Sequence, residues 1–474
     1  MEEEKPRSKL YVFEPLIRRL PEVAVPKRHV AFKERFLWTG VALVVFFIMV
    51  QIPLYGMVGE PGSFFGYLRY VLASHAGTIM ELGIGPIVTA GIIMQLLVGG
   101  KIINLDMSDP DDRALFTGVQ KILAVVMAIF EAVMLVFGGW YDPRRFSATA
   151  APLSTGTNVF LIVQLVLGAI VVIYLDELVS KYGFGSGVSL FIAGGVAGEI
   201  VWKAFTPAAS AQNLGMIGAI PNFIRALISG SSTQIGEAFT RSNLPNIMSV
   251  FATLIVFFIV VYAESLRIEI PLAYGKFGGM RGRYPIKFLY TSNIPVILAM
   301  TVFANIKIVA SLLARAGHPF LGTVGGGGVP ASGLIYYLEP PSGIASVTAD
   351  PLRAVIYLVI LMVICIGFAW LWVQMTGMGP RDVAQQLQDS GLSIPGFRRD
   401  IRVMGWVLER YIKTVTIMSG AFVGVLAALA DFMGALGSGT GILLTVGIIY
   451  GLYEEIARER VSEMFPAVRR LFGE

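Results

Sequence analysis

Long apolar runs separated by short polar stretches make up most of this chain of 474 residues. Each run has a length of about 20 residues, which an α-helix needs to cross the hydrocarbon core of a bilayer. The pattern predicts membrane-spanning helices. The runs cover residues 36–54, 115–137, 159–175, 188–205, 247–263, 289–313, 351–374, 411–430 and 438–453.

A further apolar stretch, residues 83–97, is short and contains Gly85, Pro86 and Gly91. It follows a second short, half-apolar piece, residues 64–74. Broken helices at membrane depth are tolerated only against protein or a water-filled cavity, because lipid cannot bond the freed backbone groups. Counted as one crossing, the two pieces bring the total to about ten and predict an internal path through the protein.

Basic residues are distributed unequally between the two sides of these crossings. With ten crossings, both termini lie on one side, which carries 28 Lys and Arg residues against 8 on the other. Lys and Arg are enriched in cytoplasmic loops. We therefore expect a multi-pass protein of the cell (plasma) membrane with both termini in the cytoplasm. Residues 1–35 are charged and lack the cleavage site of a signal peptide, so the first run is expected to remain.

The order of the runs suggests two halves of opposite topology. An odd number of crossings in the first half inverts the second, and inverted halves often meet at a central path. We expect an all-α polytopic membrane protein with two inverted halves of five helices. Residues 216–228, apolar but too short to span, predict an interfacial helix. The expected segments are a cytoplasmic amino-terminal segment (1–35), the first half (36–205), an external connection (206–246), the second half (247–453) and a cytoplasmic tail (454–474).

The sequence offers little for catalysis. It contains no H-E-x-x-H motif, and its glycine-rich stretches at 183–187 and 322–328 lack the strand context or the Lys-Ser/Thr pair of nucleotide sites. The three histidines are scattered along the chain, and the single Cys365 allows no intramolecular disulfide. We therefore expect no enzyme activity, no metal and no cofactor.

Several segments closely resemble SecY, the family of channel subunits of the protein translocon, in its archaeal and eukaryotic branch. The likeness runs from about residue 36 to the carboxyl end and weakens in the outer loops. It implies a channel that passes unfolded polypeptides across the membrane and releases hydrophobic segments sideways into lipid. The segments that carry it are 83–97, 176–187, 290–298 and 304–306.

This resemblance implies an hourglass-shaped channel with a constriction of aliphatic side chains at mid-membrane. Such side chains give an ion no replacement for its hydration shell, so a ring of them excludes ions and still yields to a passing chain. Residues spaced i,i+4 project along one helix face, as the members of a ring must. The alternative is that these aliphatic residues only pack against other helices or face lipid. By motif position, the ring residues are Ile84, Val88, Ile192, Val196, Ile297 and Leu444, with Leu443 as the alternative to the last.

Residues 61–74 resemble the plug of this family, a half-helix that seals the external funnel. They include Phe64, Phe65, Tyr67 and Arg69, which are bulky or charged for a seal. The alternative is an amphipathic helix at the outer interface, with Arg69 reaching water. The plug is favoured because the broken partner helix follows directly.

Polar residues inside the runs are further candidates. An ionised carboxylate near the bilayer centre costs about 2.5–3.5 kcal/mol on insertion scales, so Glu131 should be paired, protonated or next to water. The resemblance implies that Thr89, Glu131 and Asn305 meet at a lateral gate and set the hydrophobicity needed to open it. The rival interpretation is a proton relay, for which Glu199 is the plausible second carboxylate.

Two long loops, residues 267–287 and 381–413, are rich in arginine. Topology alone places basic residues in cytoplasmic loops, but arginine also pairs well with phosphates, and the SecY family docks the ribosome through these loops. The residues expected to contact ribosomal RNA are Arg281, Arg283, Arg398 and Arg399. The resemblance also implies SecE-like and Sec-beta-like small membrane subunits, the nascent polypeptide with its signal sequence, and the lipid bilayer as partners.

Two other functions compete with the channel interpretation. A secondary transporter of a small solute, also built from inverted repeats, would need a compact polar site at mid-membrane, where this sequence has aliphatic residues. An intramembrane enzyme such as an insertase-linked protease would need paired carboxylates or a Ser/His set, which the sequence lacks.

Overall fold

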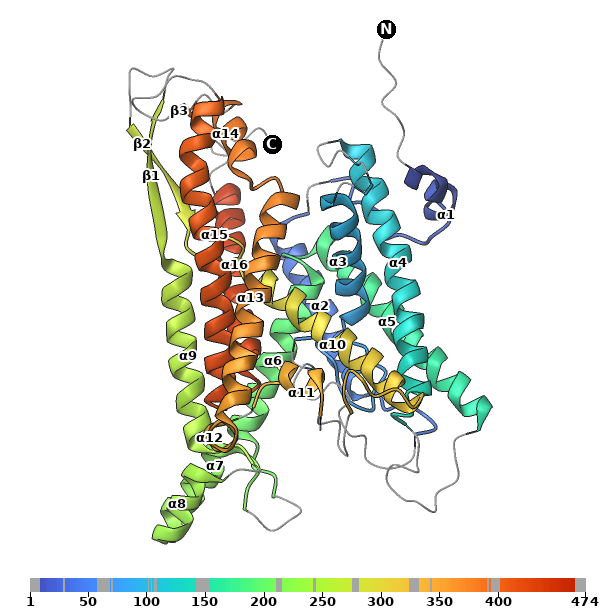
Figure 1. Cartoon of the computed structure of the whole chain (residues 1–474), viewed down its shortest axis with the longest axis vertical. Coiled ribbons are helices and arrows are strands. Elements are labelled where there is room, and N and C mark those ends of the chain that lie inside the picture. The colour runs from blue at the N-terminus through green and yellow to red at the C-terminus, as the bar shows by residue number, and fades with distance from the viewer. Residues whose placement is uncertain are drawn as a thin grey trace. The chain divides into compact units, whose positions relative to one another are not determined.

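Helices dominate the part of the chain that the computed structural model describes (Figure 1). The description leaves out residues 1–8, 29, 58–68, 70, 101, 104, 106–108, 142–153, 210–214, 242–243, 275–280, 324–331, 342, 390–391, 394–400 and 465–474. Within the described residues, nine helices are long and apolar enough to cross a membrane, and the shorter apolar helix α3 lies between the first and second of them. The predicted helical, multi-pass fold is therefore confirmed.

The amino-terminal elements are η1 (Lys9–Phe13), α1 (Glu14–Ile17), α2 (Phe32–Gln51), α3 (Gly85–Gly99), α4 (Pro110–Phe137), α5 (Thr155–Tyr182) and α6 (Gly187–Phe205). The central elements are α7 (Ala219–Ser229), α8 (Ser232–Thr240), α9 (Ile247–Ser265), β1 (Arg267–Tyr274), β2 (Arg281–Lys287) and α10 (Ile294–Arg315). The carboxyl-terminal elements are α11 (Leu334–Leu338), α12 (Ile344–Ala349), α13 (Pro351–Met375), α14 (Pro380–Asp389), β3 (Leu392–Ser393), α15 (Ile401–Phe432) and α16 (Gly439–Met464).

Several long helices begin at a polar residue whose side chain satisfies a free backbone N–H group, as N-cap residues do. Proline follows two of these caps as the first helical residue, where its missing N–H costs nothing. In each case the side-chain oxygen of the cap accepts a backbone N–H group from the first turn. Asp109 accepts that of Asp111 in α4, Ser154 that of Thr157 in α5, Asn246 that of Ser249 in α9, and Asp350 that of Arg353 in α13.

The first of two compact units consists of Met1–Ile200, Met300–Glu339 and Ile448–Glu474. In it α3 packs against α4, α4 against α5, and α5 against α2 (Figure 1). A Cβ atom at Gly168 of α5 would collide with the carbonyl of Ile79. The glycine therefore lets the loop between α2 and α3 lie directly on α5.

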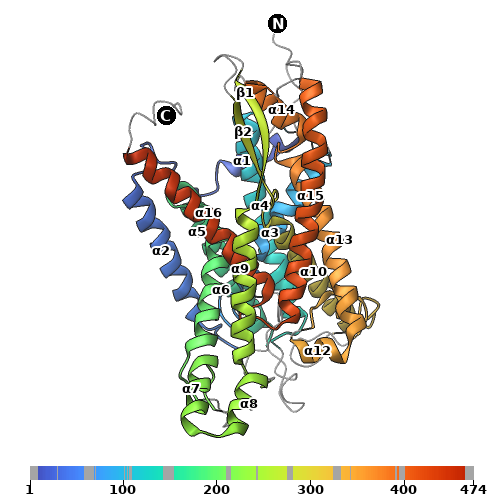
Figure 2. The ribbon, with the colours of Figure 1, turned by 90° about the vertical axis from the view of Figure 1, so that its left-hand side faces the viewer.

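The second unit consists of Val201–Ala299 and Pro340–Gly447. Its main contact is between α13 and α15. Gly420 and Gly424 of α15 lie so close to the backbone of α13 that a Cβ atom at either position would be 2.9 Å from an α13 Cα atom. Small residues allow such close helix packing in membranes. Helices α7 and α8 lie at one end of α9, and β1 continues from the other end (Figures 1 and 2).

A three-stranded antiparallel sheet of order β2-β1-β3 is the main element that the sequence analysis missed. The range 267–287 was expected to be a loop. Instead β1 pairs with β2 from Arg267↔Lys287 to Ala273↔Arg281, and β3 joins through Ala273↔Ser393. Ile286 of β2 belongs to a buried cluster with residues of α13, α14 and α15, so the sheet is anchored to the helices. The other members of the cluster are Val373, Val383, Ala384, Leu387, Met404, Leu408, Ile412 and Val415.

Candidate functional site

A chain of hydrogen bonds, buried at Glu131 and partly buried at Asn305, joins three helices of the first unit. Asn305 of α10 donates from Nδ2 to Oγ1 of Thr89 in α3, at 3.0 Å. Thr89 in turn donates from Oγ1 to Oε1 of Glu131 in α4, at 3.2 Å. The structure thus brings together the three residues that the sequence analysis assigned to the lateral gate, although they are up to 216 positions apart in the chain.

Glu131 is only 2% exposed, so its carboxyl group depends on protein partners. Burying a polar group is costly unless it is hydrogen-bonded, and Thr89 supplies such a bond. Gly85 makes room for the carboxyl group, because a Cβ at this position would lie 3.1 Å from Oε2 of Glu131. The glycine near the start of the broken helix is therefore part of the polar site.

The start of α3 is set by a tight turn. Gly83 adopts φ +55°, and a Cβ there would collide with the carbonyl of Leu72. That carbonyl accepts the N–H of Ile84 at 2.8 Å. The turn places Ile84 immediately before the first residue of α3, with Val88 one turn further along.

The six constriction candidates are distributed over both units. In the first unit, Ile84 and the α6 residues Ile192 and Val196 are fully buried, and Val88 is half-buried. In the second unit, Leu444 of α16 is fully buried and Ile297 of α10 is half-buried. The ring itself remains a prediction.

The two candidates in the second unit lie on helices that are joined by a hydrogen bond. Asn293, immediately before α10, donates from Nδ2 to the carbonyl of Leu443 at 3.1 Å. It thus links the start of α10, which carries Ile297, to the part of α16 that carries Leu444.

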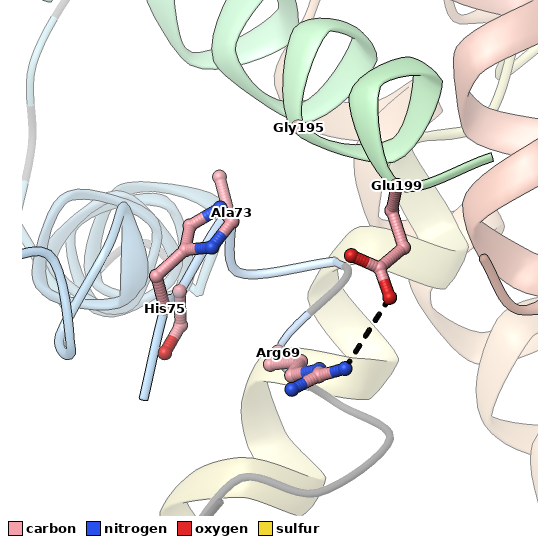
Figure 3. Close-up of a pocket in the computed structure, with 6 residues that line it drawn as sticks. Arg69, Ala73, His75, Gly195 and Glu199 are labelled. Atoms are coloured by element: carbon pink, nitrogen blue, oxygen red, sulfur yellow. Dashed lines mark hydrogen bonds and ion pairs between the residues drawn. The ribbon is translucent and has the colours of Figure 1, made fainter. Parts of the chain in front are cut away.

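Of the plug candidates, Phe64, Phe65 and Tyr67 lie outside the described residues. Arg69 is described, and its Nη2 lies 3.5 Å from Oε1 of Glu199 in α6. The pair borders a small pocket that is also lined by Ala73, Ser74, His75 and Gly195 (Figure 3). From the sequence, Glu199 was expected only as a possible relay carboxylate, and its pair with Arg69 was not predicted.

The docking candidates are described in part. Arg281 and Arg283 lie on β2, opposite Ala273 and Pro271 of β1. Arg398 and Arg399 lie outside the described residues. Because β3 comes from the 381–413 range and pairs with β1, the structure joins the two basic loops in one sheet. The alternation Arg267-Ile268-Glu269-Ile270 is the sequence signal that could have predicted β1.

A second ion pair in the first unit was also missed. Lys307 of α10 lies with its Nζ 3.2 Å from Oε2 of Glu339, which directly follows α11. The two side chains are 4% and 15% exposed. The sequence placed Lys307 within a span, but its partner, 32 positions away, can be found only from the fold.

Glu177, near the carboxyl end of α5, holds the amino-terminal segment against α4 and α5. Its carboxylate lies 2.8 Å from Nζ of Lys121 and 2.7 Å from Nζ of Lys181. It also accepts the N–H of Val23 at 3.2 Å, while Lys121 and Lys181 donate to the carbonyls of Pro21 and Val23. We call these five residues the amino-terminal clasp.

Among the described residues, nine helices long and apolar enough to cross a membrane, with the shorter α3 and its hydrogen-bonded polar chain, define a multi-pass α-helical membrane protein of the channel or transporter class. Comparison with known families narrows this class. The family model described as SecY matches residues 78–453, and the model described as the plug domain of Sec61p matches residues 44–77. The chain therefore belongs to the SecY family.

Known relatives are similar over almost their whole length. The chain is 48% identical to the protein translocase subunit SecY of Pyrococcus furiosus, over 98% of this chain and 99% of the relative. A solved structure described as a protein conducting channel superposes with a TM-score of 0.81 at 44% identity and covers 96% of this chain and 99% of its own. Sec61 in the canine ribosome-channel complex from the endoplasmic reticulum gives a TM-score of 0.78 at 43% identity, again over 96% and 99%.

Proposed function

We propose that this chain is the channel-forming subunit of a protein translocase, which passes unfolded polypeptides across a membrane and releases hydrophobic segments into the bilayer. The observation that carries this proposal is the match to the plug and SecY families end to end, over residues 44–77 and 78–453. A small-solute transporter would need a compact polar site at mid-membrane, where this chain has buried Ile84, Ile192 and Val196. We propose no enzymatic role.

The constriction consists, in our proposal, of Ile84, Val88, Ile192, Val196, Ile297 and Leu444. Their aliphatic character and the burial of four of them support this role. A narrow ring of such side chains excludes hydrated ions, because it offers them no replacement ligands. The plug, residues 61–74, closes the channel on the external side.

The lateral gate is proposed to contain the chain from Asn305 through Thr89 to Glu131. Its two hydrogen bonds connect the broken helix to α4 and α10. Inside a low-dielectric protein such bonds are strengthened, so the chain holds the gate closed until a hydrophobic segment replaces its contacts.

Ribosome docking is assigned to Arg281, Arg283, Arg398 and Arg399. Guanidinium groups bind phosphate in a bidentate geometry, and ribosomal RNA presents phosphates densely. The sheet that joins the two loops supports a shared docking surface. The ribosome also supplies the driving force, because the sequence offers no nucleotide site.

We further propose the orientation and the segments that follow from the distribution of charge. Both termini, with residues 1–35 and 454–474, lie in the cytoplasm, and residues 206–246 connect the halves 36–205 and 247–453 outside. The membrane is the plasma membrane. SecE-like and Sec-beta-like subunits complete the complex.

Site-specific crosslinking tests the channel proposal. In a Cys365→Ser background, Ile192→Cys should form a disulfide with a single cysteine in a ribosome-stalled secretory chain, at chain lengths that place this cysteine at mid-membrane. Val163→Cys is the matched control, because Val163 of α5 is 46% exposed on an apolar helix and should face lipid. Adducts at Val163 equal to those at Ile192, or none at Ile192, Ile84 and Ile297 with normal expression, would favour the transporter.

A further inference from the structure

Asp431, in the last turn of α15, is a buried acid to which the proposed function gives no role. The residue is only 2% exposed. Its Oδ1 accepts the N–H of Gly439 at 2.7 Å and that of Thr440 at 3.1 Å, and its Oδ2 accepts the hydroxyl of Thr440 at 3.1 Å. Gly439 and Thr440 are the first two residues of α16. Both oxygens of the carboxyl group are therefore engaged by the start of the next spanning helix.

The start of α16 needs such an acceptor. The first N–H groups of a helix have no partner within the helix, and a helix amino terminus favours a negative group. Thr440 is fully buried, so bulk water does not reach its N–H or its hydroxyl. A buried polar group without a hydrogen bond is costly. Asp431 thus supplies from α15 what the first turn of α16 lacks.

The turn between α15 and α16 is fixed by further contacts. The carbonyl of Asp431 accepts the N–H of Gly434 at 3.0 Å, and Leu436 donates its N–H to Oγ1 of Thr253 in α9 at 2.9 Å. Ser438 adopts φ +70°, a conformation that persists in a residue with a side chain only where the surroundings hold it. The turn is therefore tied to both α15 and α9, and it leads into α16 without a loose loop.

These contacts bear on a constriction candidate one helical turn further along. Thr440 and Leu444 are spaced i,i+4 and lie on the same face of α16. Asn293 holds the next turn, because it donates to the carbonyl of Leu443 at 3.1 Å. To bring a neighbouring residue to the same place, a helix must move by about 1.5 Å along its axis and turn by about 100°. Polar contacts at the start of α16 and one turn later resist both movements.

We propose that Asp431 is a positioning residue of the channel: its carboxyl group holds the first turn of α16 so that Leu444, and not Leu443 or Thr445, is presented to the translocating chain. The inference rests on the proposed channel function and on the place of Leu444 in the constriction. It adds the residue that sets the register of α16. Asp431 acts through α16 and is assigned no contact with the polypeptide.

Disulfide crosslinking along α16 tests this register. In membranes that contain the full chain with Cys365→Ser, single cysteines replace Leu443, Leu444 and Thr445 in turn. Each is oxidised in the presence of a ribosome-stalled secretory chain that carries one cysteine. With Asp431 intact, the adduct should be strongest at Leu444→Cys. Asp431→Ala should lower the ratio of adducts at Leu444→Cys to those at Thr445→Cys by roughly two- to ten-fold, as expected when about one net hydrogen bond no longer holds the helix.

Two further variants separate positioning from general stability. Asp431→Asn keeps an oxygen for the two N–H groups and an amide that can donate to the hydroxyl of Thr440, so the ratio should stay within about two-fold of the parent protein. Asp350→Ala is the matched control, because Asp350 also caps a spanning helix, by accepting the N–H of Arg353 at 3.2 Å, but α13 carries no constriction candidate. It should lower the midpoint of thermal unfolding and leave the ratio unchanged. Where Asp431→Ala does not fold, Thr440→Val replaces it, since it removes the hydroxyl that donates to Oδ2.

An unchanged ratio in both Asp431→Ala and Thr440→Val would overturn the inference, and so would equal adducts at the three α16 positions in the parent protein. A fall in Asp350→Ala as large as that in Asp431→Ala would also overturn it, because the ratio would then report only lost stability. In each of these cases adducts at Ile192→Cys would leave the channel proposal intact. No adduct at Ile192→Cys or at any α16 position would overturn the proposed function, and the inference with it.

Discussion

Thr89 occupies the centre of the polar chain, since it donates to Glu131 and accepts from Asn305. No local pattern in the sequence shows that these residues meet, because three separate helices supply them. The family resemblance predicted the meeting, and the fold brings it about. Single substitutions at this position therefore test the gate more sharply than changes in the apolar residues around it.

Thr89→Val should destabilise the closed gate, because the isosteric side chain neither donates to Glu131 nor accepts from Asn305. Two intramolecular hydrogen bonds are lost, at about 0.5–1.5 kcal/mol each. We expect translocation of substrates with weakly hydrophobic signals to increase, as measured by protection of the substrate inside vesicles. Thr117→Val, at an exposed threonine of α4 that bonds only within its helix, is the control.

Glu131→Gln should also change which signals open the gate and leave strong signals working, since the amide still accepts from Thr89. A complete loss of transport in Glu131→Gln, together with wild-type transport that requires a proton gradient, would contradict the gate and indicate a proton relay.

At the scale of elements, the spans were predictable because each is a long apolar run. Their limits were less predictable. The run 411–430 lies inside α15, Ile401–Phe432, because the helix begins earlier and includes Arg402, Glu409 and Arg410. Charged residues are compatible with helix outside the hydrocarbon region but interrupt an apolar pattern. The sheet was missed because prolines and glycines hide its alternation.

The Lys307–Glu339 pair connects α10 to the residue that follows α11. Removing one partner of a buried ion pair takes that attraction away from the remaining charge and costs about 3–5 kcal/mol. Glu339→Gln should therefore lower the midpoint of thermal unfolding in detergent, and the combination with Lys307→Met should recover much of the loss. Equal midpoints for wild type and Glu339→Gln would show that the pair contributes nothing.

The amino-terminal clasp fixes residues 21–23 to α4 and α5 through the carboxylate of Glu177. Glu177→Ala removes both ion pairs and one backbone hydrogen bond. We expect the amino-terminal segment to become more sensitive to protease by several-fold, while the thermal midpoint changes little. Glu237→Ala, at an exposed carboxylate of α8, serves as the comparison, and unchanged cleavage in Glu177→Ala would mean that the bonds from Lys121 and Lys181 to the carbonyls of Pro21 and Val23 hold the segment without Glu177.

At the scale of the whole molecule, the family and the multi-pass architecture followed from the sequence, but contacts between distant residues did not. Neither Arg69–Glu199 nor the link from Asn293 to Leu443 could be derived from spacing, since the partners are 130 and 150 positions apart. Such contacts depend on how helices pack. Ile192 and Leu444, which were named from motif position, are fully buried. Residues of a constriction and residues of ordinary helix packing are both buried, so the ring stays a prediction.

Binding to the ribosome should depend on salt if arginines contact RNA phosphates. Replacing Arg281 and Arg283 by Gln should weaken binding and reduce the slope of log affinity against log salt by about 1–2 units, because each phosphate contact releases counterions. Co-sedimentation of vesicles with ribosomes over a salt series measures both quantities. A slope equal to that of the wild type would show that Arg281 and Arg283 do not contact RNA phosphates and only contribute to the orientation of the protein in the membrane.

The sheet also has a mechanical consequence. Only Leu266 separates the end of α9 at Ser265 from the start of β1 at Arg267, and the ladder to β2 begins at that first strand residue. Ile286 ties the other strand into the helical core. The paired strands β1 and β2 therefore extend a spanning helix, and a force applied to them is transmitted both to α9 and to the helices that pack around Ile286.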